Sequence, residues 1–310
     1  MRKAYGNVDA GLWDSIVAHD TWMHPPLELA SSPEGVAAGQ VDTLVETLRR
    51  DGIAVMPNLL PEEICDALER IAEKAECRLV HPLGPLTGGD ENRLRFDATS
   101  PVAVRYDVDE QDVVASPEAQ GLLADESLLA VAQAYLGSAP VLDLVAMWWS
   151  AAVGQVASSS AAQLFHFDLD RMRFLKFFVL LTDVGDQNGP HVYVKGSHIT
   201  KPAQLRRDGR HQDRVVEEAF PGAVATIKGL RGTMFLADTI GLHKGLALVD
   251  GHRLMFQMEW ATSLFGAPYA TPSIAEPSED LVNLAKRHPE VFGRFELPSE
   301  SVVESGAAGD

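Results

Sequence analysis

The chain has 310 residues, of which 26 are Lys or Arg and 44 are Asp or Glu, so its formal net charge is −18. This acidity argues against a nucleic-acid or anionic-membrane partner, since either would require a basic face. The longest strongly apolar stretch, 144–149, is too short to span a bilayer, and the first ten residues lack the apolar segment of a secretory signal. Only two cysteines occur, Cys65 and Cys77, which makes a disulfide scaffold unlikely on composition and leads us to expect a cytoplasmic protein.

The first half of the chain is expected to consist of helices and loops. Residues 1–40, interrupted by glycine and proline, are predicted to form an irregular N-terminal arm. A short strand is predicted at 53–60, and long loops at 81–118, which is rich in Gly, Pro and Asp. Apolar residues at helical spacing predict three helices: 41–50, a helix opened by Pro61 that carries both cysteines, and 122–137, which ends at Gly137. On one helix, the two cysteines would lie too far apart for a disulfide.

From Val141 onward the sequence changes to short β-like runs separated by turns. The runs are VLDLVAMWW, AQLFHFDLD, FLKFFVLLTDV, HVYV, AVATIK, GTMFLA and RLMFQMEW. Such a series predicts an antiparallel sandwich or barrel. A charged insertion at 201–222 interrupts the series and is expected to act as a lid-like loop. We therefore expect one domain over 41–272, followed over 273–310 by a helix (EDLVNLAKRH) and a flexible tail.

The strongest chemical signal is the motif His166-Phe167-Asp168. Residues i and i+2 of a strand point to the same face, so an imidazole and a carboxylate would lie side by side. A third metal ligand should come from a distant strand, and His243 is the best candidate. Two histidines and one carboxylate leave three coordination positions open, as in non-haem Fe(II) sites that activate oxygen. Alone, H-x-D is more often a surface or hydrogen-bonded pair, and the same three ligands also suit a zinc-dependent hydrolase.

Arg253 is a candidate for binding an anionic co-substrate. In the run RLMFQMEW, the alternation of a strand places Arg253, Met255 and Gln257 on one face. A guanidinium inside a β-barrel needs a carboxylate partner, because a buried unpaired charge is costly. A co-substrate carboxylate could be that partner, and the alternative is an ion pair with Glu259 or Asp250.

Taken together, these segments resemble the phytanoyl-CoA dioxygenase (PhyH) family. The resemblance spans roughly 45–262 and rests on DGIAVMPNLLPEEICDALERI, LFHFDLD, FFVLLTDVGDQNGPHVYVKGSH, GTMFLADTIGLHKG and Arg253. It implies a mainly-β fold with flanking helices around a double-stranded β-helix (jelly-roll) core. It also implies a dioxygenase that uses Fe(II), 2-oxoglutarate and O2 and releases succinate and CO2. His166, Asp168 and His243 would then be the iron ligands, and Arg253 would bind the distal carboxylate of 2-oxoglutarate.

Two positions depart from the family pattern. Lys195 stands where the family usually has proline before G-S-H, and Met255 stands where related oxygenases often have Ser or Thr. Asp168 fills a position that is small in halogenating relatives, so the resemblance implies hydroxylation or another oxidation.

The expected substrate is a small metabolite of specialised metabolism. Residues 166–215 contain nine Lys or Arg and six Asp, a local charge of 9 − 6 = +3, which favours an anionic substrate unless this segment is only a solvated loop. A non-catalytic jelly-roll binding protein and a zinc-dependent hydrolase are the alternatives. The sequence gives no expectation for the oligomeric state.

Overall fold

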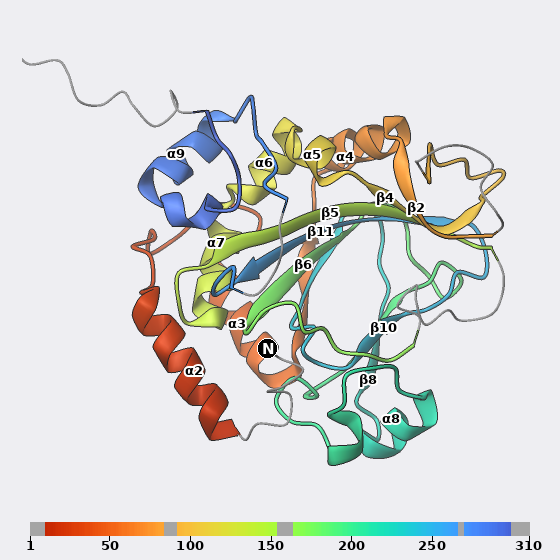
Figure 1. The fold of residues 1–310 in the computed structure, drawn as a ribbon, viewed down its shortest axis with the longest axis horizontal. Helices are drawn as coiled ribbons and strands as arrows, with labels where there is room; N and C mark the ends of the chain where they lie inside the picture. The colour runs from red at the N-terminus through yellow and green to blue at the C-terminus, as the bar shows by residue number, and fades with distance from the viewer. Residues whose placement is uncertain (1–9, 84–91, 154–163, 266–269, 299–310) are drawn as a thin grey trace, which may run out of the picture.

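The computed structural model describes residues 10–83, 92–153, 164–265 and 270–298. Within these ranges, two antiparallel sheets form the walls of a jelly roll (Figure 1). The spatial order of strands in the large sheet is β1 (Ile53–Leu59), β9 (Thr233–Ala237), β6 (Phe174–Leu180), β11 (His252–Ala261), β5 (Val141–Ala151), β4 (Ala103–Val108), β2 (Cys77–Pro82) and β3 (Arg93–Leu94). The small sheet has the order β10 (His243–Gly245), β7 (His191–Val194) and β8 (Val224–Ile227). The predicted mainly-β fold with a jelly-roll core is confirmed.

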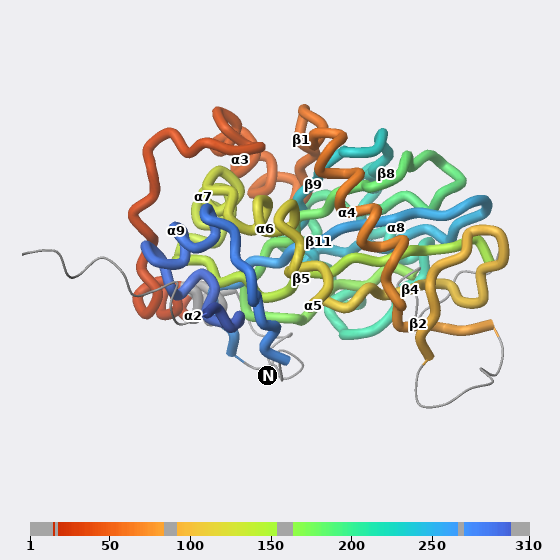
Figure 2. The backbone as a smooth tube through the Cα atoms, turned by 90° about the horizontal axis from the view of Figure 1, so that it is seen from above, coloured from red at the N-terminus to blue at the C-terminus, as the bar shows by residue number. Residues whose placement is uncertain are grey.

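Helices pack against the large sheet on the side away from the small sheet, and at one end of it (Figures 1 and 2). They are α3 (Val41–Asp51), α4 (Glu62–Lys74), α5 (Glu110–Val114), α6 (Pro117–Leu123), α7 (Glu126–Leu136) and α9 (Glu279–Arg287), followed by the 3-10 turn η2 (Pro289–Phe292). A continuous hydrophobic cluster joins them to the sheet and includes Leu48, Leu68 and Leu284. Removing these side chains from water is the main stabilising contribution of this layer.

The alternation along β11 decides which side chains face the interior of the jelly roll. Leu254, Phe256 and Met258 belong to the hydrophobic cluster under the helices. Arg253 and Gln257, on the opposite face, line a cavity between the two sheets. The predicted assignment of the two faces of this strand is therefore confirmed.

The predicted helix at 41–50 and the strand after it are also confirmed. Helix α3 ends at Gly52, which adopts φ 80° and donates its N–H to the carbonyl of Leu48. Only glycine takes this left-handed conformation without strain, so the Asp51-Gly52 pair is an effective stop signal.

Two regions predicted to be irregular contain regular structure. Helix α2 (Ala10–Met23) occupies part of the predicted arm. The predicted loops at 81–118 contain β3, β4, α5 and the start of α6. Pro82 and Pro117 lie at the ends of elements rather than in loops. We interpreted the abundance of proline as a sign of loops, whereas these prolines mark where a strand ends and a helix begins.

Two helix predictions also need correction. The segment 122–137 is split between α6 and α7, because the carboxylate of Asp125 accepts the N–H of Leu128 at 2.9 Å and caps a new helix. Cys77 is not on α4 but begins β2, since the chain becomes extended at Ala75. The helical spacing argument for the cysteines was therefore wrong, although both are free and buried.

Other expectations concern the ends and the insertion. The insertion at 201–222 contains the 3-10 turn η1 (Ala203–Leu205) and helix α8 (Asp213–Ala219), and its role as a lid stays a prediction. The C-terminal helix is confirmed as α9, while 299–310 of the expected tail lie outside the described residues. Among the helices that the structure describes, none is long and apolar enough to cross a bilayer.

Candidate metal centre

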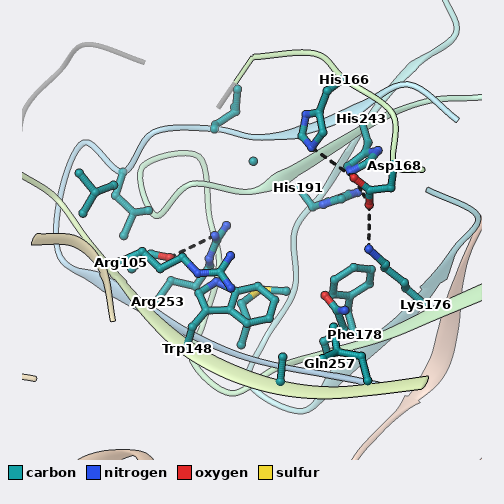
Figure 3. Close-up of a pocket in the computed structure, with 18 of the residues that line it drawn as sticks. Arg105, Trp148, His166, Asp168, Lys176, Phe178, His191, His243, Arg253 and Gln257 are labelled. Atoms are coloured by element: carbon teal, nitrogen blue, oxygen red, sulfur yellow. Dashed lines mark hydrogen bonds and ion pairs between the residues drawn. The ribbon is translucent and has the colours of Figure 1, made fainter. Parts of the chain in front are cut away.

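The three predicted metal ligands lie together at one end of the cavity between the sheets (Figure 3). His166, Asp168 and His243 each present a ligand atom, and these atoms all lie within 4.8 Å of one another. Nε2 of His166 is 3.7 Å from Oδ1 of Asp168, and Nε2 of His243 is 3.6 Å from Oδ2.

Backbone pairing brings these residues together although the expected strand at 162–170 does not form in its described part. His166 and His243 make an isolated antiparallel bridge, with N···O distances of 3.0 and 2.8 Å. The N–H of Asp168 donates to the carbonyl of Thr239 at 2.8 Å. The two motifs thus face each other directly, as the third ligand was predicted to do.

Both imidazoles are held in the tautomer that a metal requires. Nδ1 of His166 lies 2.8 Å from the carbonyl of Leu164, and Nδ1 of His243 lies 3.0 Å from the carbonyl of Gly241. A carbonyl oxygen can only accept, so each Nδ1 carries a proton, and each Nε2, next to Asp168, keeps a lone pair available for a metal.

The electrostatics of the three groups also suit a divalent cation. Burial, followed by the nearby His243, lowers the pKa of His166 to about 3. Burial likewise lowers the pKa of His243. For Asp168, burial alone would raise the pKa, but Lys176 and His243 outweigh it, so the pKa lies well below its usual range. At neutral pH the site therefore offers two neutral imidazoles and one carboxylate.

Lys176 is a site residue that the sequence analysis missed. It lies in β6, is 7% exposed, and its Nζ donates to Oδ2 of Asp168 and to Oδ2 of Asp170, each at 2.8 Å. Nζ also lies 3.3 Å from Oε2 of Glu259. A lysine inside the apolar run FLKFFVLL was the available signal, because a buried ammonium requires carboxylate partners.

Arg253 is buried without a carboxylate partner among the residues that the structure describes. Its Nη1 donates to the carbonyl of Gly189, its Nη2 lies 3.5 Å from Oγ of Ser150, and its Nε has no hydrogen-bond acceptor. Burial, with a smaller contribution from Arg105, lowers its pKa from 12.5 to about 10. The alternative of an ion pair with Glu259 is wrong, because Glu259 pairs with Lys176.

The cavity has a volume of about 340 Å³ and connects the metal-ligand candidates with Arg253. Figure 3 shows the histidines and Asp168 on one side and Arg253, Arg105 and Trp148 on the other. The Arg105 guanidinium lies 4.3 Å from the centre of the Trp148 ring, which lines the cavity. Trp149 points to the opposite face and joins the core under the helices.

His191 also lines the cavity. Its ring stacks on that of His243, with 5.5 Å between centroids and 19° between planes. Burial holds its pKa well below the usual range, and its Nε2 has no hydrogen-bond partner.

The chain matches one family model and is similar in fold to solved structures. The model of the family "Phytanoyl-CoA dioxygenase (PhyH)" matches residues 48–234. No curated protein matches the chain. Among solved structures, HygX from Streptomyces hygroscopicus, with nickel and 2-oxoglutarate bound, is 17% identical with a TM-score of 0.51, over 77% of this chain and 92% of that chain. The non-heme alpha-ketoglutarate-dependent epimerase SnoN from nogalamycin biosynthesis is 17% identical with a TM-score of 0.50, over 75% of this chain and 93% of that chain.

These two structures show the same fold, whereas the family match covers more than half of the chain. The chain therefore belongs to the phytanoyl-CoA dioxygenase family of Fe(II)- and 2-oxoglutarate-dependent oxygenases.

Proposed function

We propose that this oxygenase hydroxylates an unactivated C–H bond of a small-molecule metabolite and releases succinate and CO2 from 2-oxoglutarate. His166, Asp168 and His243 would hold Fe(II), and Arg253 would bind the distal carboxylate of 2-oxoglutarate. One observation carries the proposal: three convergent metal-ligand atoms share a cavity with a buried guanidinium that has no carboxylate partner among the described residues.

The surroundings of Arg253 fit a dicarboxylate. A bound carboxylate would give Nε the acceptor that it lacks and Nη2 a better one than Ser150 at 3.5 Å, in the two-pronged geometry that suits arginine. Ser150 lies directly opposite Arg253 in the register of β5 and β11, so its hydroxyl can supply a second contact that Met255 cannot. Arg105 lies opposite Ser150 on β4, and its positive charge adds to the attraction.

Bound Fe(II) and 2-oxoglutarate supply the oxidising chemistry, with O2 as the oxidant. The protein holds both imidazoles by their Nδ1 hydrogen bonds and keeps Asp168 ionised. Asp168 occupies the position that is small in halogenating relatives, which supports hydroxylation. Apolar side chains such as Leu144 and Phe178 line the cavity and limit the access of water.

The substrate is proposed to be small, anionic and part of specialised metabolism. A cavity of about 340 Å³, which must also hold 2-oxoglutarate, is at the lower end of the usual range for ligand sites. The Nε of Arg105 binds Asp107 at 2.5 Å, and Asp107 also binds Arg78 at 2.6 Å, so one carboxylate is shared by two guanidinium groups. The remaining positive charge supports recognition of an anionic group. The fold shared with an enzyme of nogalamycin biosynthesis is consistent with specialised metabolism.

We also propose a cytoplasmic location, with which two free, buried cysteines are consistent.

Anaerobic titration of the metal-free protein with Fe(II) and 2-oxoglutarate tests the proposal. We expect the weak metal-to-ligand charge-transfer band in the green region, and its loss in the variant Arg253→Met. Fully occupied Fe(II) without this band would contradict the proposal. A hydrolase on the same ligands would instead recover activity with Zn²⁺ alone, and a binding protein would form no succinate in a substrate screen.

A further inference from the structure

We infer that Lys176 is a positioning residue, which holds Oδ2 of Asp168 and so leaves Oδ1 as the single metal-ligating oxygen. The inference rests on the proposed metal-binding role of Asp168.

Three carboxyl groups surround the ammonium group of Lys176. Nζ donates to Asp168 and Asp170, each at 2.8 Å. It also lies 3.3 Å from Oε2 of Glu259, an ion-pair contact in which that oxygen accepts no hydrogen bond. Because the side chain is 9% exposed, water competes little for these donors. The ammonium therefore has one stable position, and Oδ2 of Asp168 is fixed relative to it (Figure 3).

The backbone of Lys176 is better anchored than that of Asp168. Lys176 lies in the middle of β6, paired with Ala237 of β9 on one side and Glu259 of β11 on the other. Asp168 lies in a segment that the structure assigns to no strand, and its side chain is 20% exposed. Through its hydrogen bond to Asp168, Lys176 thus connects a proposed ligand in an irregular segment to the centre of the large sheet.

The consequence for coordination follows from the two carboxylate oxygens. With Oδ2 occupied by the ammonium, Oδ1 remains for the metal, 3.7 Å from Nε2 of His166. A carboxylate that could rotate would also bind through both oxygens and close one of the open positions. Hydrogen bonds to ligand carboxylates from outside the ligand set commonly govern metal affinity in this way.

The variant Lys176→Met keeps an unbranched apolar side chain that ends at Cε and removes the ammonium group. We expect the metal-free variant to bind Co(II), measured by calorimetry, roughly 10- to 100-fold more weakly than the wild type. We also expect the charge-transfer band of the Fe(II) and 2-oxoglutarate complex to change position. A folded variant with unchanged Co(II) affinity and an unchanged band would overturn the inference.

Two matched variants separate positioning from general charge balance. Lys244→Met removes another lysine with 7% exposure, which directly follows His243 in β10 but whose Nζ binds Asp213 at 2.7 Å. Glu259→Gln changes the most distant of the three carboxyl groups around Lys176. Co(II) affinity in both should stay within about 3-fold of the wild type. A loss as large as that of Lys176→Met in either variant would overturn the inference.

A double variant covers the case in which Lys176→Met does not fold. Lys176→Met combined with Glu259→Gln removes the ammonium together with a buried carboxyl group that faces it, so Glu259 is not left without its cationic partner. The weak Co(II) binding should persist in this protein, and wild-type affinity would overturn the inference. If the wild type itself binds no Co(II) and forms no charge-transfer band, the proposed function fails instead.

Discussion

Replacing Arg253 by methionine should make the metal-free protein more stable while weakening its binding of 2-oxoglutarate. The folded-state pKa of Arg253 is depressed from 12.5 to about 10, so at every pH below about 10 the charged form destabilises the fold. The difference amounts to about 3 kcal/mol, at about 1.4 kcal/mol per factor of ten. The hydrogen bonds to Gly189 and Ser150 offset about 1 kcal/mol or somewhat more.

The net gain in stability of Arg253→Met is therefore about 1–2 kcal/mol, which corresponds to a rise in Tm of roughly 2–4 °C in a protein of this size. In the bound state the sign reverses, since removing one partner of a buried charge pair costs about 2–5 kcal/mol, or a roughly 30- to 3,000-fold higher Kd for 2-oxoglutarate. Differential scanning calorimetry of the metal-free protein and titration of the charge-transfer band measure the two effects.

Arg294→Met is the matched control. Arg294 is also buried, with a side chain that is 5% exposed, but its two Nη atoms bind the carboxylate of Glu110 at 2.5 and 2.6 Å. Breaking this pair should cost about 3–5 kcal/mol and lower the Tm. If Arg253→Met lowers the Tm of the metal-free protein as Arg294→Met does, Arg253 is a satisfied structural residue and the reasoning fails.

Four further measurements test the fold and the site. His243→Ala should weaken Co(II) binding at least about 100-fold without unfolding the chain, and unchanged binding would remove His243 from the ligand set. Burial raises the pKa of Cys77 to about 12, so its thiol should resist iodoacetamide at pH 8 until the protein unfolds, whereas rapid native labelling would contradict its burial. The same raised pKa means that stability is fully present below pH 9 and declines as pH rises toward 12, a decline that Cys77→Ala should reduce in urea unfolding. Asp125→Ala should cost about 1–2 kcal/mol in urea unfolding, because the carboxylate caps α7 and accepts the N–H of Val36, while Asp125→Asn should lose less.

The sequence predicted best those features that depend on local alternation. The two faces of β11 follow from neighbouring residues alone, so Arg253 could be placed in the interior before the fold was known. His166 and Asp168 were expected on a strand. They instead occupy an irregular segment whose bridge to His243 still makes the side chains converge.

Features that depend on distant partners were harder to predict. The burial of Lys176 depends on Asp168 and Asp170, which precede its strand, and on Glu259, 83 residues away. Its strand alone therefore gave only a conflict between charge and apolar surroundings. The break before α7 depends on competition between capping by Asp125 and continuation of a helix, and apolar spacing contains no information on that competition. Cys77 was misplaced for a similar reason, since Ala75 and Glu76 are good helix formers that the tertiary fold holds in another conformation.

The two ends of the cavity belong to different walls of the jelly roll. His243 is carried by the small sheet, whereas Arg253 projects from the large one. In the proposed assignment, the distance between the two sheets sets the length of oxo acid that can bind. A shorter homologue such as oxaloacetate could not contact both the metal and Arg253. Selectivity for the length of the oxo acid would then depend on how the two sheets are joined. Substitutions where the sheets meet could alter this selectivity without changing His243 or Arg253.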